Sequence, residues 1–337
     1  MKHQVAFLLV GIVALAGGCA SQPVEPDWVS GNSSKYPDSR YLIGRGQAAS
    51  QDQARDRARA DLAKVFQVAI SEETEDMTNF TRARSKGEQA QDYTASVSRA
   101  IRTRTDQVVE GVEIAEQWQA PEGGEHHALA VLNRAKQGAR MRAQLNELDD
   151  ATEAHIQSAR ASSDLITRIG AAERAVDAQL ERRAVQRLLQ VIDVTGTGIA
   201  PPYNLGKLLD DRDALLKRLR IAPQVTAGSP AELEQHLSSG LAAAGFLHAP
   251  GEQAGYVLSG NFQPSSFTDE QGWHWVRGTL AVTLREQAGK SVRGTHRWDI
   301  KVSSREHATA QQRARDRIAT VLRDDLRSVI ISFGQPK

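Results

Sequence analysis

The residue types that most often perform chemistry are present in this sequence, but not at the spacings that chemistry requires. No H-E-x-x-H or C-x-x-C pair is available to bind zinc, and no G-x-S-x-G turn is available to present a serine nucleophile. The one cysteine, Cys19, directly follows an apolar N-terminal segment. We therefore expect no catalytic residues, no metal site and no bound cofactor, in a protein that is not an enzyme.

The histidines and paired carboxylates are better explained as strand and surface residues. His126 and His127 are adjacent on an expected strand, so their side chains point to opposite faces. His274 and His296 share a face of an expected hairpin but lie far apart along it. Consecutive helical residues point about 100° apart, which disfavours acid–base dyads. The carboxylate pairs concerned are Asp149–Asp150, Asp210–Asp211 and Asp324–Asp325.

A glycine pattern near the N-terminus imitates a dinucleotide-binding turn. Gly44-x-Gly46-x-x-Ala49 follows a short apolar run and precedes a helix. The polar stretch after that helix offers no buried parallel strand for a nucleotide-binding unit. We therefore expect a tight turn that ends at Ser50, which caps the helix with Gln53 in a capping box.

Aromatic residues near the C-terminus suggest a site for a partner. Trp273 and Trp275 share one face of an expected strand, opposite the face assigned to the core, and Phe267 lies nearby. An exposed aromatic patch of this kind often marks an interaction surface. In the alternative interpretation, the loop 262–272 folds over both tryptophans. These three residues are the candidate partner-binding residues.

The first 19 residues have the organisation of an export signal. Lys2 and His3 precede the apolar run 5–16, and two glycines precede Cys19. Twelve apolar residues cover only about 18 Å of helix, too short for a permanent transmembrane segment. The stretch L-A-G-G-C resembles a bacterial lipobox, although Ala16 stands where leucine is usual. The resemblance implies a lipid-bearing Cys19; an ordinary cleavage site after Ala16 is the alternative.

Composition narrows the classes of partner. A net charge of +1 gives no reason to expect a basic surface that binds phosphates, and an aromatic content of 5% makes a platform for base stacking unlikely. We therefore expect that nucleic acid is not a partner. A chain of 337 residues is long enough for two domains, and a single cysteine cannot form an internal disulfide. The fold must rest on apolar burial and backbone pairing.

The N-terminal half alternates tether, helix and strand patterns. Residues 19–40 are rich in Pro, Ser and Gly and predict a tether, from which Trp28 docks onto the following domain. An alanine-rich helix follows Ser50, and alternation over 66–80 predicts a strand exposed on one face. Residues 93–107 fit either strand or helix. Residues 111–118 and 125–133 predict a hairpin.

The second half begins with a helix-favouring stretch and ends in a second α+β unit. Residues 134–193 predict a helical hairpin that breaks near 158–163. A helix capped by Ser229 and a long hairpin follow, in which a loop at 288–290 pairs Val276 with Val302, Leu280 with Trp298 and Val282 with His296. A final helix, capped by Ser303 and Glu306, covers the apolar face of that hairpin.

The N-terminal part resembles the LPP20 family of bacterial lipoproteins. The motifs that carry the resemblance are P-D-W-V at 26–29, Y-L-I-G-R-G-Q-A at 41–48, G-V-E-I-A-E-Q-W and H-H-A-L-A-V-L-N-R, within about 26–145. The chain is also similar to the N-terminal module of a flagellar basal-body assembly protein. The resemblance implies a compact α+β module on a lipidated tether and no catalytic residues to carry over.

The expected fold class is α+β, with two small antiparallel-sheet and helix modules joined by a long helical hairpin after a cleaved lipoprotein signal. The expected divisions are a signal at 1–18, a tether at 19–40, an LPP20-like domain at 41–133, a helical region at 134–220 and a C-terminal domain at 221–337.

The expected function is a non-enzymatic, lipid-anchored scaffold or assembly module for an envelope complex: flagellar, surface or cell-wall. The alternative is a lipid- or glycan-binding carrier. The expected location is the periplasmic face of the outer membrane of a Gram-negative bacterium, since Ala20 and Ser21 follow the cysteine. A membrane surface and an envelope protein are the expected partners. The oligomeric state is not indicated.

Overall fold

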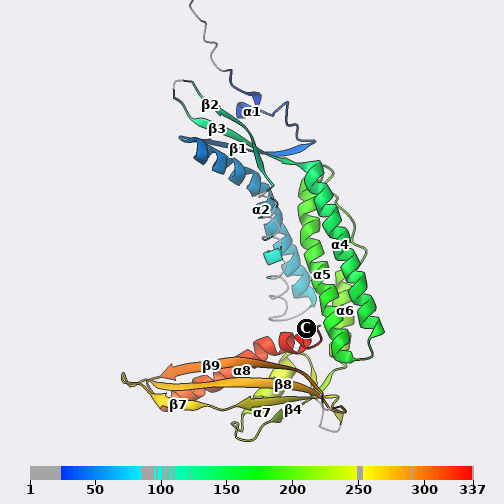
Figure 1. Cartoon of the computed structure of the whole chain (residues 1–337), viewed down its shortest axis with the longest axis vertical. Coiled ribbons are helices and arrows are strands. Elements are labelled where there is room, and N and C mark those ends of the chain that lie inside the picture. The colour runs from blue at the N-terminus through cyan, green and yellow to red at the C-terminus, as the bar shows by residue number, and fades with distance from the viewer. Residues whose placement is uncertain are drawn as a thin grey trace, which may run out of the picture. The chain divides into compact units, whose positions relative to one another are not determined.

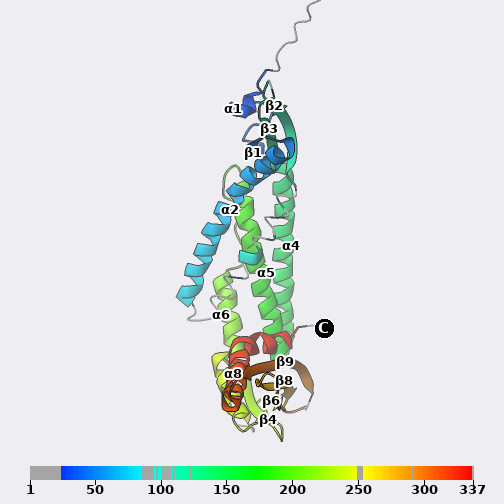
Figure 2. The ribbon, with the colours of Figure 1, turned by 90° about the vertical axis from the view of Figure 1, so that its left-hand side faces the viewer.

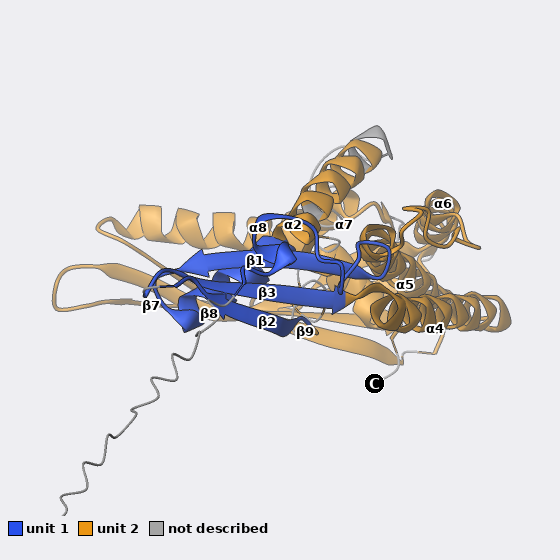
Figure 3. Ribbon diagram, turned by 90° about the horizontal axis from the view of Figure 1, so that it is seen from above, with its two compact units in different colours: residues 1–63, 112–132 blue, residues 64–111, 133–337 orange. Residues whose placement is uncertain are grey.

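The computed structural model describes residues 24–84, 111–121, 123–248, 253–289 and 291–335, with individual residues between 95 and 108. Cys19 and the signal lie outside the described residues. The chain forms two compact units (Figure 3): unit 1 comprises Met1–Ala63 and Val112–Leu132, and unit 2 comprises Lys64–Gly111 and Asn133–Lys337. Among the described helices, none is both long and apolar enough to cross a membrane.

Unit 1 is a three-stranded sheet covered by the start of a helix. Strands β1 (Tyr41–Ala48), β3 (His126–Asn133) and β2 (Glu113–Gln119) lie in the order β1-β3-β2. The predicted hairpin is confirmed, because β2 and β3 pair antiparallel, with Trp118 opposite His127.

The turn expected at Gly44 and Gly46 is wrong, because β1 continues through both glycines. A Cβ atom at Gly46 would lie 1.9 Å from the carbonyl oxygen of Ala54, and one at Gly44 would lie 2.4 Å from that of Ala58. The glycines therefore let the helix approach the strand closely. Ser50 accepts a hydrogen bond from the Gln53 amide at 3.5 Å, as its expected capping role requires.

Trp28 docks onto this sheet, as the sequence predicts. It lies in the short helix α1 (Asp27–Ser30), which corrects the expectation of an unstructured tether at that point. Its ring is 2% exposed and packs against Leu129 and Val131 of β3. Its indole nitrogen donates a hydrogen bond of 2.7 Å to Glu116 on β2.

The strand expected over 66–80 is wrong, because helix α2 runs without a break from Gln51 to Arg84. Its buried positions continue at three- and four-residue spacing: Ala54, Ala58, Leu62, Phe66, Ala69, Glu73 and Met77. Glu73 occupies one position of this stripe and pairs with Arg183 in unit 2. A charged residue at a buried position concealed the helical period. The described residues between 95 and 108 are also helical, which settles the open alternative for them.

A helical hairpin forms the centre of unit 2 (Figures 1 and 2). Helices α4 (Arg134–Ala161) and α5 (Leu165–Ile192) are separated by three residues, so the break predicted near 158–163 is confirmed. The Asp164 carboxylate caps α5 by accepting from the Thr167 amide at 2.9 Å. Helix α6 (Leu205–Leu216) follows the Pro- and Gly-rich connection.

The C-terminal part of unit 2 is a six-stranded sheet with two helices on one face (Figure 1). In chain order its strands are β4 (Arg220–Val225), β5 (Leu247–His248), β6 (Tyr256–Phe262), β7 (Ser265–Thr268), β8 (His274–Glu286) and β9 (Val292–Ser304). The three residue pairs predicted for the long hairpin are confirmed. β4 pairs parallel with β5 and β6, and the other pairs are antiparallel.

Helices α7 (Leu233–Ala243) and α8 (His307–Ser332) bury the apolar face of this sheet. The predicted capping roles of Ser229 and Ser303 are wrong. Ser229 accepts from the Phe262 amide instead, and Ser304 accepts from the Glu306 amide at the start of α8. The prediction that the last helix covers the apolar face of the hairpin is confirmed, because α8 buries Ala314, Ile318, Val321, Leu322, Leu326, Val329 and Ile330. The α+β fold class is confirmed.

Candidate functional site

The outer face of the C-terminal sheet carries the predicted aromatic residues together with cations. We define the aromatic–cationic cluster as Phe267 of β7, Trp275 and Arg277 of β8, and Lys301 of β9. Phe267 lies directly opposite Trp275 in the β7–β8 ladder, and Arg277 lies opposite Lys301 in the β8–β9 ladder. The buried neighbour Val276 points to the helix-covered face, so alternation directs these side chains outward.

The two rings of the cluster stack and the cations lie over them. The ring centroids of Phe267 and Trp275 are 6.3 Å apart with planes 9° from parallel. The guanidinium carbon of Arg277 lies 4.7 Å from the Phe267 ring and 5.2 Å from the Trp275 ring. The ammonium nitrogen of Lys301, on the neighbouring strand β9, lies 5.2 Å from the centroid of the Trp275 ring. Each exposed cation–π contact contributes about 0.5–1 kcal/mol.

Asp269 fixes the position of Trp275. Its carboxylate accepts a hydrogen bond of 2.8 Å from the Trp275 indole nitrogen and another from the Trp273 amide. These bonds, the indole bond foremost, hold the pKa of Asp269 below its usual value. The carboxylate therefore stays ionised and orients the ring in the neutral range.

Trp273 does not share the arrangement expected for it. Both tryptophans are half-buried, but Trp273 precedes β8 and Trp275 lies within it. The guanidinium carbon of Arg305 lies 4.7 Å from the centroid of the Trp273 ring. Part of the segment expected as a covering loop is strand β7, which lies beside Trp275 rather than over it. Phe267 remains 42% exposed. The structure therefore brings Phe267 and Trp275 together, whereas Trp273 lies against Arg305.

Sequence reasoning missed Arg277, Lys301 and Asp269. The first two could have been found, because Arg277 is two residues from Trp275 on the same strand and the predicted hairpin register places Lys301 opposite it. No periodicity indicates Asp269, whose role depends on the turn between β7 and β8. The face so formed combines flat rings with two cations that have no ion-pair partner among the described residues, and the N–H groups of such cations bind carboxylates or phosphates.

The other candidate residues do not converge. His274 pairs opposite Ser304 and His296 opposite Val282, at separate points along the hairpin, as expected. In the described part of the chain, no group of three or more histidines, cysteines or carboxylates could hold a metal ion. Asp149 and Asp325 have structural roles: Asp149 pairs with Arg182 of α5, and Asp325 accepts from the Trp298 indole.

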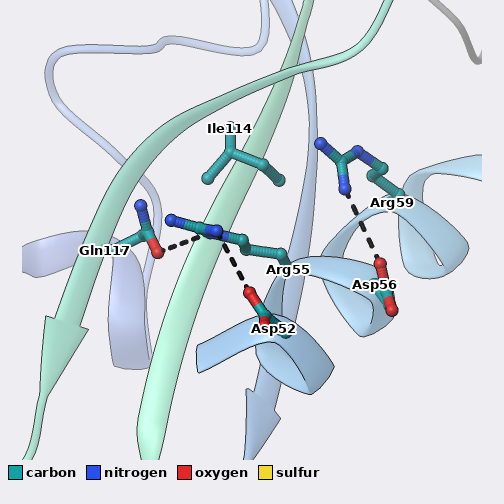
Figure 4. Close-up of a pocket in the computed structure, with 6 residues that line it drawn as sticks. All are labelled: Asp52, Arg55, Asp56, Arg59, Ile114 and Gln117. Carbon is teal, nitrogen blue, oxygen red and sulfur yellow. Dashed lines mark hydrogen bonds and ion pairs between the residues drawn. The ribbon is translucent and has the colours of Figure 1, made fainter. Parts of the chain in front are cut away.

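A polar hollow of about 490 Å³ lies on unit 1 between α2 and β2 (Figure 4). Its two arginines already have partners. Arg55 contacts Asp52 at 3.1 Å and Gln117 at 2.8 Å, and Arg59 lies 3.6 Å from Asp56. The charges in the hollow therefore balance locally, which makes it a weak site for an anion.

A smaller and more apolar hollow of about 230 Å³ lies between α7, α8 and the sheet. Leu233, Phe262, Val276 and Ile318 contribute its apolar walls. Ligand pockets in proteins usually enclose about 300–1,000 Å³. This space is below that range, and none of the three predicted aromatic residues lines it.

Comparisons with known proteins agree with the family expected from the sequence. Residues 26–133 match the family model described as LPP20 lipoprotein. No curated protein matches the chain. The similarity to a flagellar assembly module stays a prediction.

Several solved structures are similar to this one. The secreted protein HP1454 of Helicobacter pylori is 14% identical, with 84% of this chain and 96% of that chain covered and a TM-score of 0.41. A minor lipoprotein of Acinetobacter baumannii is 17% identical over 36% of this chain and 99% of its own, with a TM-score of 0.27. Protein XCC0632 of Xanthomonas campestris is 11% identical, with 34% of this chain and 84% of that chain covered and a TM-score of 0.27.

Proposed function

We propose that this chain, whose residues 26–133 match the LPP20 lipoprotein family model, is a non-enzymatic lipid-anchored scaffold of the bacterial envelope. Its lipid is carried by Cys19, at the periplasmic face of the outer membrane. The partner is an envelope protein with an acidic surface, bound by the aromatic–cationic cluster. The function rests on binding and position rather than on catalysis.

The observation that supports this proposal is the composition of the cluster. Arg277 and Lys301 present two cations around two stacked rings on an open sheet face. Aromatic and arginine side chains are the residue types that most often dominate protein interfaces. The opposite face of the sheet is filled by α7 and α8, so the outer face is the one available to a partner.

The carrier alternative has weaker support. A bound lipid chain would need an enclosing apolar pocket, whereas Phe267 and Trp275 lie on an open face. The apolar hollow beside α7 and α8 is smaller than usual ligand pockets. A flat face suits another macromolecule better.

Photocrosslinking in intact cells tests the scaffold function. Benzoylphenylalanine at Phe267 is expected to trap a discrete protein, and the same group at Leu247, which is similarly exposed at 47%, is the control position. Arg277→Glu should reduce the yield at position 267 at least about tenfold, because it sets like charges against an acidic partner. Arg323→Glu makes the same charge change on exposed α8 and should not.

Trapping only of lipid or glycan would favour the carrier function and contradict the scaffold. Equal protein yields at both positions, or a yield that Arg277→Glu leaves unchanged, would also count against it. The anchor is tested separately by Cys19→Ser and by globomycin: unchanged processing and unchanged membrane fractionation would refute lipidation at Cys19.

A further inference from the structure

Strand β9 forms an open edge of the C-terminal sheet. β8 pairs with β7 through residues 274–277 and with β6 through residues 280–286, so both lie along one side of β8. β9 pairs with β8 along its whole length and must occupy the other side. Within the described residues, no strand pairs with the far side of β9, which is 13 residues long.

This edge lacks most of the features that protect strand edges in proteins. Natural edge strands are commonly short, or carry a proline, an inward-pointing charge or charged side chains such as lysine. Of these features, β9 has outward charges, at Arg297, Asp299 and Lys301. β9 has no proline, and its inward positions are Gly294, His296, Trp298, Ile300 and Val302. The one irregularity in its pairing lies at the hairpin end, between Leu284 and Arg285 of β8. An edge of this length is a template for another strand.

The side chains on the outer face of β9 favour one partner strand. Arg297 and Asp299 are both exposed and stand on either side of Trp298, the midpoint of the strand. Arg297 has no ion-pair partner among the described residues, and Asp299 accepts only an exposed hydrogen bond, from Thr279 at 3.2 Å. A second β9 in antiparallel orientation, centred on Trp298, would place each Arg297 opposite the other chain's Asp299.

The register that pairs these charges also gives the greatest overlap. Centring on Trp298 aligns Val292 with Ser304 of the second chain and therefore uses the entire strand. Shifting the centre to Asp299 would oppose two aspartates and set Arg297 against Lys301. Shifting it to Arg297 would oppose two arginines. Since like charges directly opposite each other destabilise strand pairs, only the central register suits both charge and length.

We propose that two copies of this chain associate through β9, with antiparallel pairing centred on Trp298, to form one continuous sheet across a two-fold axis. The contact is isologous, so it closes at two copies. The outer faces of the two sheets join, which places two aromatic–cationic clusters on one surface. This proposal does not depend on the identity of any envelope partner.

Charge exchange within β9 tests the proposal directly. The full-length lipidated protein is measured in density-matched detergent by sedimentation equilibrium, and a dimer is expected. Arg297→Asp and Asp299→Arg should each weaken association at least about tenfold, because either change converts two opposite-charge pairs into two like-charge pairs. The double variant Arg297→Asp, Asp299→Arg restores both pairs and should regain the wild-type dissociation constant.

Arg285→Asp is the matched control, because it makes the same charge change at an exposed position of β8. Circular dichroism establishes that each variant is folded. The proposal is overturned if the wild-type protein is monomeric at all concentrations measured, if neither single variant weakens association, or if the control weakens it equally. A folded double variant that stays as weak as the single variants would overturn the register.

Discussion

Replacement of Trp28 by alanine is expected to unfold the sheet of unit 1 locally. The ring is 2% exposed and packs against β3, so its removal leaves a cavity as well as losing buried apolar surface. Such replacements cost about 3–5 kcal/mol. The Glu116 carboxylate is not left without a partner, because Lys35 binds its other oxygen at 2.7 Å. The cost therefore comes chiefly from packing.

Trp28→Phe separates the two contributions. Phenylalanine keeps most of the packed ring but loses the hydrogen bond of 2.7 Å to Glu116, which contributes about 1 kcal/mol. Hydrogen exchange of the β3 amides, followed by mass spectrometry, measures the effect on this sheet. We expect exchange to quicken by more than about a hundredfold in Trp28→Ala and by about fivefold in Trp28→Phe.

Amides of α8 serve as the internal reference, because α8 belongs to unit 2. The reasoning is refuted if the alanine variant quickens β3 exchange less than tenfold. It is equally refuted if alanine and phenylalanine have the same effect, since packing would then contribute nothing beyond the hydrogen bond.

Two further predictions concern a close contact and a pH dependence. Gly46→Ala should lower the free energy of unfolding by several kcal/mol, because its Cβ would overlap the Ala54 carbonyl, whereas Gly255→Ala, which meets nothing within 4 Å, should not; urea titration compares them. Burial tends to raise the pKa of Asp164, but hydrogen bonds from Thr167 and Tyr256 together with the charge of Arg293 hold it below its usual value. Its stabilisation is therefore complete above the ordinary aspartate pKa and lost as pH falls through the lowered one. Asp164→Asn should flatten this acid limb of a stability–pH profile, and an unchanged profile would contradict the assignment.

The β8–β9 hairpin could be predicted from sequence to the level of its residue pairs. Its two strands alternate regularly, and a one-residue slip would have exposed Leu280 and Val282, so only one register was acceptable. The break between α4 and α5 was also accessible, because Ser162 and Asp164 are residues that end and begin helices.

The features that could not be predicted depend on contacts that the local sequence pattern does not indicate. The second half of α2 was assigned to a strand because Glu73 interrupts its apolar stripe, and its partner Arg183 is 110 residues away. Gly44 and Gly46 look like a turn until a helix is placed against them. Asp269 acts through two tryptophans brought to it by a tight turn. In each case the contact that determines the structure joins residues far apart in the sequence or depends on the conformation of a turn. The local spacing of apolar residues does not indicate such contacts.

The order of the elements along the chain has a consequence for its folding. Helix α8 is synthesised after all six strands of the C-terminal sheet, and it supplies Ile318, Leu322 and Leu326 to the core of that sheet. Until those residues emerge, the strands already produced present a bare apolar surface and an open edge to water. Chains in this state are prone to aggregate. The C-terminal sheet can therefore complete its core only once α8 is available to cover it.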